Sequence, residues 1–229
     1  MNYVLIGDIH SQAKSLESAL SFIRKNISNA KVIFLGDIFD SKTKYSDSYK
    51  VYTLVREAER DLNAIILQSN HQDKLIRYLK GNKVHIHGGL ERTLNELLKK
   101  LTINELYSWL IRQSFGVVFR DEFGIEFRCA HAYFNSDVQI QDYTNEYHIR
   151  AIRRDHKHQF LYGLQDDKKN RINWWENDNS SQTFIRVAGH YREVYTNLEN
   201  KSLILDSNCG EDVGVLSVYN VNERKLYQF

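Results

Sequence analysis

The sequence predicts an α/β fold, and three observations support this prediction. Short apolar runs that end in glycine or a polar residue are typical of buried strands. Longer segments between these runs carry apolar residues three and four positions apart, which is typical of amphipathic helices. The two kinds of segment alternate along the first third of the chain, so we expect a largely parallel sheet covered on both faces.

The first third of the chain holds three predicted strands and the two helices between them. Ser11 is a suitable N-cap for the first helix, because its hydroxyl can accept a hydrogen bond from the first turn. In chain order, strand, helix, strand, helix and strand are predicted at 3–6, 11–28, 32–35, 51–62 and 64–67.

The remainder of the chain is less regular. A third helix is predicted to begin at residue 75, and residues 93–113 form a further helical region. Residues 135–183 have weak periodicity and many polar residues, so they are interpreted as an insertion or cap. Further strands are predicted at 117–119, 125–130, 184–188, 203–205, 213–219 and 226–229.

Composition excludes several classes of protein. The chain has 229 residues and no proline, which excludes collagen-like and proline-rich disordered chains. Its apolar runs stop far short of the ~18 residues that a membrane-spanning helix needs, so no membrane partner is expected. Two cysteines are too few for a disulfide scaffold, and polar residues interrupt the first apolar stretch, so a cytoplasmic location is predicted. One domain over residues 1–229 is expected, since no repeat or linker composition is visible.

Metal-binding residue types follow five of the predicted strands. The carboxyl ends of parallel strands converge on one crevice, where ligands bind in open α/β sheets. Any one of these residues alone is more typical of a turn, a helix cap or a surface site. Five strand ends carrying the same residue types favour one common cluster of side chains. The residues are Asp8 and His10, Asp37 and Asp40, Asn70 and His71, His131, and His190.

The chemistry of this set predicts a two-ion site. Mixed carboxylate, amide and imidazole ligands suit Mn²⁺, Fe or Zn²⁺. The set exceeds what one catalytic ion with open positions needs, so one carboxylate would bridge two ions. Two ions ~3.5–4 Å apart polarise a phosphoryl group and generate hydroxide from water, which predicts hydrolysis of phosphoesters.

The order of these motifs resembles that of the calcineurin-like metallophosphoesterases. Within this family the phosphoprotein-phosphatase branch fits best, because the segment 203–207 resembles a late strand of that branch. The resemblance implies a sandwich of mixed β-sheets flanked by helices, with an insertion or cap around residues 135–183. The motifs are GDIH at 7–10, GDIFD at 36–40, SNHQ at 69–72, AHA at 130–132 and AGHY at 188–191.

A narrower resemblance is to the phosphatase module of bacterial polynucleotide kinase-phosphatases. It rests on KLIRYLKG at 74–81, HGGLERTL at 87–94, and LYG at 161–163 followed by Arg171 and Trp174. The resemblance implies phosphomonoesters or phosphodiesters of nucleotides or RNA ends as substrates, with 2′,3′-cyclic, 2′- or 3′-phosphates, and a role in RNA repair. Protein serine/threonine phosphatase and diadenosine polyphosphate hydrolase are the enzyme alternatives, the first with a phosphoprotein partner.

The family resemblance also implies a role for each residue of the cluster. Two divalent ions are implied, manganese first, with iron, zinc and nickel as alternatives. His71 would donate a proton to the leaving oxygen, and Asp40 would orient His71 and favour its protonated form. Asp8 and His10 would hold the first ion, Asp37 would bridge both, and Asn70, His131 and His190 would hold the second.

The sequence departs from the family pattern at three positions. Ser41 stands where family members usually carry an arginine that clamps phosphate, Ser69 replaces a glycine, and Gln72 replaces an acidic residue. A non-enzyme alternative follows, namely a metal-retaining binding protein with a degenerate phosphate clamp. The candidate replacement cations, which we predict to bind substrate, are Lys42, Lys44 and Arg171.

The segment 148–171 concentrates positive charge, with seven arginines and lysines against three aspartates. Aromatic residues in or near it could stack on the bases of a single-stranded nucleic acid. They could equally pack on the core beneath a solvated loop. These aromatic residues are Phe160, Tyr162, Trp174 and Trp175.

Overall fold

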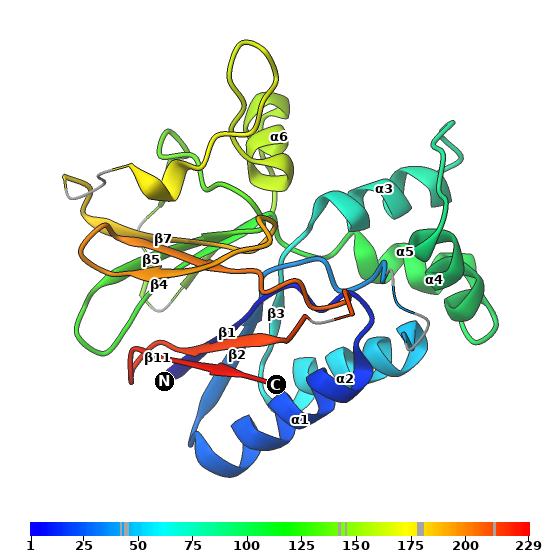
Figure 1. The fold of residues 1–229 in the computed structure, drawn as a ribbon, viewed down its shortest axis with the longest axis horizontal. Helices are drawn as coiled ribbons and strands as arrows, with labels where there is room; N and C mark the ends of the chain where they lie inside the picture. Colours follow the sequence, from blue (N-terminus) through cyan, green and yellow to red (C-terminus); the bar gives the residue numbers. More distant parts are fainter. Residues whose placement is uncertain (42, 44–45, 142, 145, 178–180, 213) are drawn as a thin grey trace.

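Two β-sheets packed face to face form the centre of the protein, and helices surround them (Figure 1). This is the fold class that the sequence predicts. The computed structural model describes residues 1–41, 43, 46–141, 143–144, 146–177, 181–212 and 214–229. The predicted substrate-binding residues Lys42 and Lys44 lie outside these described residues.

The first sheet has the strand order β11-β10-β1-β2-β3. Strands β1, β2 and β3 are parallel, as their alternation with helices predicts, whereas β10 and β11 are antiparallel additions at the other edge. The strands are β1 Asn2–Ile6, β2 Ala30–Phe34, β3 Ile65–Ile66, β10 Ser217–Asn220 and β11 Lys225–Gln228. Helices α1 (Ala13–Asn26) and α2 (Ser48–Asp61) cover its outer face (Figure 1).

The second sheet has the strand order β6-β4-β5-β7-β9-β8. Its central strands β5, β7 and β9 are parallel neighbours, and the other pairings are antiparallel. The strands are β4 Gly116–Arg120, β5 Glu126–Ala130, β6 Glu146–Ile149, β7 Phe184–Ala188, β8 Val194–Asn197 and β9 Ser202–Leu205.

Alternation along the strands divides the core into two layers. Tyr3 and Leu5 of β1 face the second sheet, where they join Phe127 and Val187 in one apolar cluster. The intervening Val4 belongs instead to the cluster beneath the helices. Side chains of a strand point alternately to its two faces, so a strand that is apolar throughout is buried on both sides.

The middle region is helical, as the sequence predicts. The helical region expected at 93–113 consists of two helices, and the first of them begins earlier, at Gly89. Thr102 and Glu105 form a capping box that begins the second helix, so the chain stops and restarts there. The three helices are α3 Asn70–Leu79, α4 Gly89–Leu98 and α5 Ile103–Leu110.

Ser11 is not the N-cap that the sequence predicts. Helix α1 begins at Ala13, and its N-cap residue Gln12 makes no side-chain cap bond. Ser11 has a left-handed backbone with φ of 60°, and its hydroxyl lies 3.0 Å from that of Ser48 on α2. The turn that positions His10 therefore directs Ser11 into the interior instead of toward the helix.

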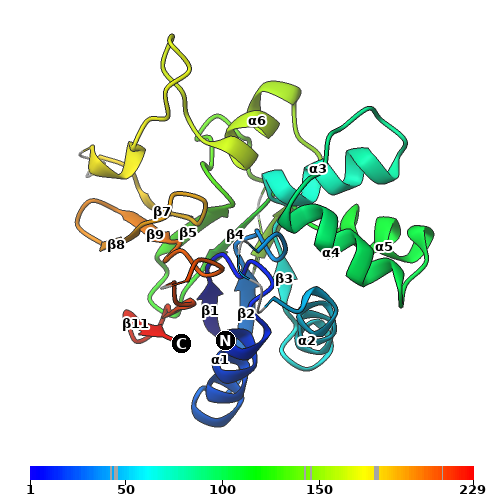
Figure 2. The same cartoon turned by 45° about the vertical axis from the view of Figure 1, so that its right-hand side comes forward.

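The predicted insertion at 135–183 is partly built into the core. It supplies β6 to the edge of the second sheet, the helix α6 (Arg154–Tyr162), which lies beside α3 (Figure 2), and the short 3₁₀ helix Trp174–Glu176. Phe160, Trp174 and Trp175 are buried. For these three residues, packing on the core is therefore the correct one of the two interpretations, whereas Tyr162 is only half-buried.

No helix in the described part of the chain is both long enough and apolar enough to cross a membrane.

Candidate metal centre

The strand ends of both sheets meet at one edge, where they bring the predicted ligands together. Asp8 and Asp37 follow β1 and β2 of the first sheet, and His131 and His190 follow β5 and β7 of the second. Among the residues that the structure describes, two groups of side chains have ligand atoms within 4.8 Å of one another. One group is Asp8, His10 and Asp37, and the other is Asp37, His131 and His190.

Asp37 belongs to both groups and lies at their centre. Its Oδ2 atom is 3.8 Å from His10 Nε2 and 3.6 Å from His131 Nε2. The sixth predicted ligand, Asn70, completes the cluster, because its Oδ1 atom lies 3.0 Å from His131 Nε2. A carboxylate shared by two groups of ligands can bridge two ions, as the sequence predicts for this residue.

The buried carboxylates of this cluster fit a bound cation. Asp8 and Asp37 are 1% and 3% exposed, and neither of their Oδ1 atoms has a hydrogen-bond partner among the described residues. A buried carboxylate without partners is costly unless a cation or hydrogen bonds compensate it. Carboxylate oxygens next to imidazole nitrogens form a donor set suited to divalent transition metals.

Backbone carbonyls orient two of the histidines toward this position. His131 Nδ1 lies 2.9 Å from the carbonyl oxygen of Leu35, and His10 Nδ1 lies 2.8 Å from that of Asp40. A carbonyl accepts a hydrogen bond only from a protonated Nδ1, which leaves Nε2 unprotonated in the neutral ring. This second contact fixes the tautomer that a metal requires.

The pKa values of the cluster reflect burial and close charges. Burial lowers the pKa of His131, and it lowers the pKa of His190 to about 3, so both rings are neutral. Burial with the carboxylates of Asp206 and Asp37 nearby raises the pKa of Asp8. Burial also favours a raised pKa at Asp37. The electrostatic effect of the surrounding histidines, which is largest for His71, outweighs burial and lowers that pKa.

Two glycines provide the space in which the ligands approach one another. A Cβ atom at Gly189 would lie 2.0 Å from Asp8 Oδ1. A Cβ atom at Gly36, whose φ is 112°, would lie 2.7 Å from His131 Nδ1. Both positions therefore require glycine, one for the close approach and the other also for its left-handed backbone.

His71 stands beside the metal cluster and is held by two carboxylates. Its Nδ1 atom lies 2.6 Å from Asp40 Oδ2, and its Nε2 atom lies 3.6 Å from Asp37 Oδ2. The contact between His71 and Asp40 is an ion pair rather than a well-directed hydrogen bond. Burial lowers the pKa of His71, but Asp37 and Asp40 outweigh this effect and raise it to about 9. The ring is therefore protonated near neutral pH and can donate a proton.

Two of the three departures from the family pattern build the start of α3. Ser69 is the N-cap, and its hydroxyl accepts a hydrogen bond from the backbone of Gln72 at 3.3 Å and donates one to the Gln72 side chain. Gln72 in turn donates to Gln113 Oε1 at 2.9 Å. This network fixes the first turn of the helix, which carries Asn70 and His71.

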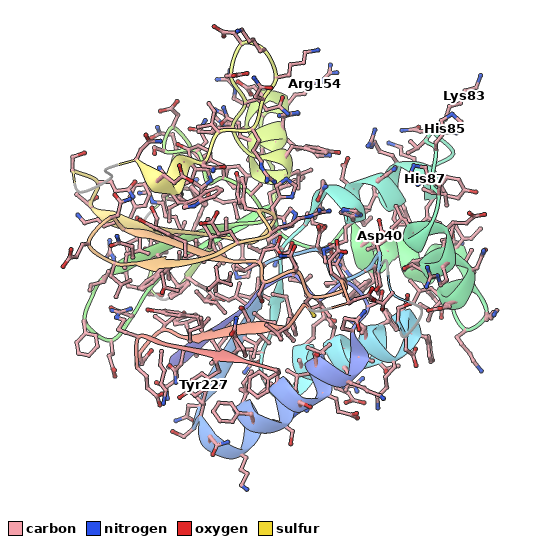
Figure 3. The ribbon with its side chains drawn as sticks, in the orientation of Figure 1. Asp40, Lys83, His85, His87, Arg154 and Tyr227 are labelled. Carbon is pink, nitrogen blue, oxygen red and sulfur yellow. The ribbon has the colours of Figure 1, made fainter. Side chains whose placement is uncertain are left out.

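The third departure removes a cation from the site. Ser41 is 2% exposed, and its hydroxyl oxygen accepts hydrogen bonds from Gln12 Nε2 at 2.8 Å and from the backbone of Thr43 at 3.1 Å. Figure 3 labels Asp40, the neighbour of Ser41, near the middle of the view, whereas Lys83, His85 and His87 lie on the loop after α3.

A cavity of about 380 Å³ opens above the cluster. The predicted residue Arg171 lines it, together with Arg192 and Asp206, which the sequence reasoning did not select as site residues. Arg192 follows the AGHY motif directly and Asp206 lies in the segment 203–207, so both were near a recognised signal. The complete lining is Asp8, His10, Asp37, Asn70, His71, Arg171, His190, Arg192 and Asp206.

Comparison with known proteins identifies the family. Residues 1–213 match the model of the calcineurin-like phosphoesterases. The chain belongs to this family. Its ligand cluster agrees with the two-metal chemistry of that family.

The relatives of this calcineurin-like phosphoesterase include proteins named for nucleotide hydrolysis. An asymmetrical bis(5′-nucleosyl)-tetraphosphatase of Oceanobacillus iheyensis is 35% identical over 104 residues, which are 42% of this chain and 40% of the relative. The chain thus aligns with about two fifths of the length of that relative. The narrower resemblance to polynucleotide kinase-phosphatases stays a prediction.

Solved structures share the fold at low sequence identity. A candidate diadenosine tetraphosphatase has a TM-score of 0.64 and 17% identity, with all of this chain and 92% of the other covered. A protein serine/threonine phosphatase of Saccharomyces cerevisiae has a TM-score of 0.58 and 10% identity, with all of this chain and 79% of the other covered.

Proposed function

We propose that this phosphoesterase hydrolyses the phosphates of nucleotides or RNA ends at a two-ion centre. The observation that carries the proposal is the position of Asp37, which is shared by the two ligand groups and also lies 3.6 Å from His71. Metal ligands and a proton donor are thus joined at one carboxylate. Hydrolysis of a phosphoester needs both, because the attacking water must lose a proton and the leaving oxygen must gain one.

Each residue of the site has a distinct role in this proposal. Asp8 and His10 would hold one ion, Asn70, His131 and His190 would hold the other, and Asp37 would contact both. When bound, two divalent ions neutralise phosphate oxygens and lower the pKa of water. We propose manganese for both, with iron, zinc and nickel as the alternatives to be ranked.

Side chains around the ions assist the departure of the leaving group and bind the phosphate. The protonated His71 would donate its proton from Nε2 to the leaving oxygen, since Nδ1 is occupied by Asp40. Asp40 would keep the ring oriented and charged before the reaction. Arg171, which lines the cavity, would bind a phosphate oxygen through its planar guanidinium.

A second candidate substrate is a dinucleoside tetraphosphate. The specific observation in its favour is the name of the Oceanobacillus iheyensis relative and of further relatives from Bacillus subtilis and Anoxybacillus flavithermus. The matched segments include about two fifths of each chain. The phosphoprotein alternative is supported here by shared fold alone, with solved structures that include the yeast protein serine/threonine phosphatase and a cold-active protein tyrosine phosphatase.

A substrate panel tests the proposal. The metal-loaded protein is assayed with nucleoside 2′- and 3′-monophosphates, 2′,3′-cyclic nucleotides, diadenosine tetraphosphate and a phosphopeptide, each with Mn²⁺, Fe²⁺, Zn²⁺ or Ni²⁺. We expect turnover of at least one nucleotide class, fastest with Mn²⁺. Turnover of the phosphopeptide alone would exclude nucleotides as the substrate class, and no turnover of any substrate would favour the metal-retaining binding protein.

Variants then test the roles of Asp37 and His71. Asp37→Asn should lose measurable activity and bind less metal by elemental analysis, because one substitution weakens both groups of ligands. His71→Ala should retain its metal content and slow esters with poor leaving groups most, since these need the proton. Equal slowing of esters with good and poor leaving groups would argue against His71 as the proton donor.

A further inference from the structure

Arg192 lines the cavity above the metal centre, and the proposed mechanism assigns it no role. Ser41 cannot replace the usual phosphate-binding arginine, because its hydroxyl carries no charge and is buried against Gln12. Among the described residues, the arginines that line the cavity are Arg171 and Arg192. Both are largely exposed, so their charged ends reach the solvent side of the cavity.

The backbone of Arg192 is fixed at the rim of the cavity. Its N–H donates to Asp206 Oδ2 at 2.7 Å, and its carbonyl oxygen accepts a hydrogen bond from Asn208 Nδ2 at 3.4 Å. Its φ of 56° is in the left-handed region, which an arginine adopts only when such contacts compensate. The side chain therefore extends from a fixed base.

The buried Tyr191 connects the two arginines. Its hydroxyl accepts a hydrogen bond from Trp174 Nε1 at 3.0 Å, and a Cβ atom at Gly163 would lie 2.2 Å from the hydroxyl oxygen. The guanidinium of Arg171 lies 5.1 Å from the centre of the Tyr191 ring, and Arg192 is the next residue in the chain. The immobilised Tyr191 ring thus holds the guanidinium of Arg171, and Arg192 follows it in the chain at the rim of the same cavity.

The ion pair that Arg192 makes is weak enough to be exchanged. Its Nη2 atom lies 3.9 Å from Glu211 Oε1, and the two side chains are 61% and 36% exposed. Exposed pairs at this distance contribute little free energy, because solvent screens them. A phosphate dianion offers two or more oxygens to the same guanidinium and would compete well with one carboxylate oxygen.

We propose that Arg192 is a second substrate-binding arginine. Its guanidinium breaks the ion pair with Glu211 and binds the non-bridging oxygens of a substrate phosphate. With Arg171 it makes up for the arginine that is absent at position 41. The inference deepens the proposed function and rests on it for the identity of the ligand. Arg192 also lines a smaller adjoining cavity of about 80 Å³ together with His71 and Asp40. Its charge therefore lies where the phosphate meets the proton donor.

Phosphate binding without turnover tests the proposal. Inorganic phosphate is titrated by calorimetry into the manganese-loaded protein and into the variants Arg192→Ala, Arg192→Lys and Glu211→Gln. Arg112→Ala is the matched control, because Arg112 is also exposed but lines cavities away from the metal centre. We expect Arg192→Ala to weaken binding about 10-fold, because it loses a charge-assisted contact, and Arg192→Lys to recover part of the loss.

The Glu211 variant separates a binding role from a structural one. Glu211→Gln should tighten phosphate binding about twofold, because Arg192 no longer has to break an ion pair with a carboxylate before it binds phosphate. A structural role for the Arg192–Glu211 pair would instead make both variants bind phosphate more weakly. That result, or unchanged affinity in Arg192→Ala, would overturn the proposal. A protein that binds phosphate through Arg192 but hydrolyses no substrate would contradict the proposed function alone.

Discussion

The Nδ1 atom of His71 lies 2.6 Å from the Oδ2 atom of Asp40, and this contact accounts for part of the charge on the histidine. Together with Asp37, Asp40 outweighs burial and raises the pKa of His71 from 6.5 to about 9. Asp40 has a φ of 74°, which asparagine adopts nearly as readily as aspartate. The pair can therefore be tested by Asp40→Asn with little change in backbone strain.

Asp40→Asn should destabilise the metal-free protein mainly at low pH. A histidine whose pKa is raised on folding contributes its stability below the unfolded value of 6.5, and loses it as the pH rises through about 9. The variant removes part of that contribution. We expect its unfolding free energy to fall by about 1–2 kcal/mol at pH 6. At pH 9.5 the difference from the unmodified protein should be small, as measured by urea unfolding with a chelator present. A difference of equal size at both pH values would mean that Asp40 acts without the charge on His71.

Gly189→Ala should disrupt the first metal position. The added Cβ atom would lie 2.0 Å from Asp8 Oδ1, so the buried carboxylate has to move. We expect loss of metal measured by elemental analysis, and a loss of stability of about 1–3 kcal/mol from crowding. Gly116→Ala is the control, because its Cβ atom would crowd Cys129 O and Phe160 at 2.8 Å and no predicted ligand is among its nearest neighbours. The control should lose stability and keep its metal, and equal metal contents in the two variants would contradict the prediction.

Ser41→Arg should not restore a phosphate clamp. The side chain would have to occupy a buried position in which Ser41 bonds Gln12 and Thr43. Overpacking of this kind costs about 1–3 kcal/mol, so we expect a lower melting temperature and no gain in kcat/KM. Ser41→Ala, which removes only the hydroxyl contacts, should cost about 1 kcal/mol. A large gain in activity would instead favour the degenerate clamp that the sequence suggests as an alternative.

The insertion should stabilise α3 through a buried carboxylate. Asp73 on α3 is 5% exposed and pairs with Lys157 of α6 at 2.6 Å and with Arg77 at 3.0 Å. Asp73→Asn should cost about 1–3 kcal/mol, because two cations then face each other. Lys157→Met should cost about 1 kcal/mol or less, since Lys157 is more exposed.

A double-mutant cycle measures this coupling. The unfolding free energies of Asp73→Asn, Lys157→Met and the double variant should be non-additive, because the two residues share one contact. Lys168→Met, on the exposed loop after α6, is the control and should leave stability nearly unchanged. Additive losses would show that α6 does not hold α3 through this pair.

Patterns of short range in the sequence predicted much of the fold. The parallel strands β1 and β2 were predictable because each is a buried apolar run that stops at a glycine. The cluster was predictable as a group, because strand ends converge on one edge of a sheet. The N-cap at Ser11 was predicted wrongly, because the hydroxyl of Ser48 lies far away in the sequence and competes for it.

Other features depend on contacts that sequence spacing does not encode. The sequence predicts that Asp8, Asp37 and His190 belong together, since each residue type recurs at a strand end. Arg192 directly follows the AGHY motif, but its residue type alone does not separate a cavity-lining arginine from any other exposed surface charge. Its position depends on its bond to Asp206, which directly follows β9, a strand that pairs with β7 only in the folded sheet.

The sequence by itself therefore determined the fold class, the alternation of strands and helices in the first third of the chain, and the chemistry of the strand-end ligands. Periodicity and residue type are local properties, and they are fixed before the chain folds. Only the tertiary structure decided that Ser41 is buried, that Trp174 packs on the core, and that Arg171 and Arg192 share a cavity. These outcomes depend on distances between segments far apart in the chain, which only the packing of the two sheets sets.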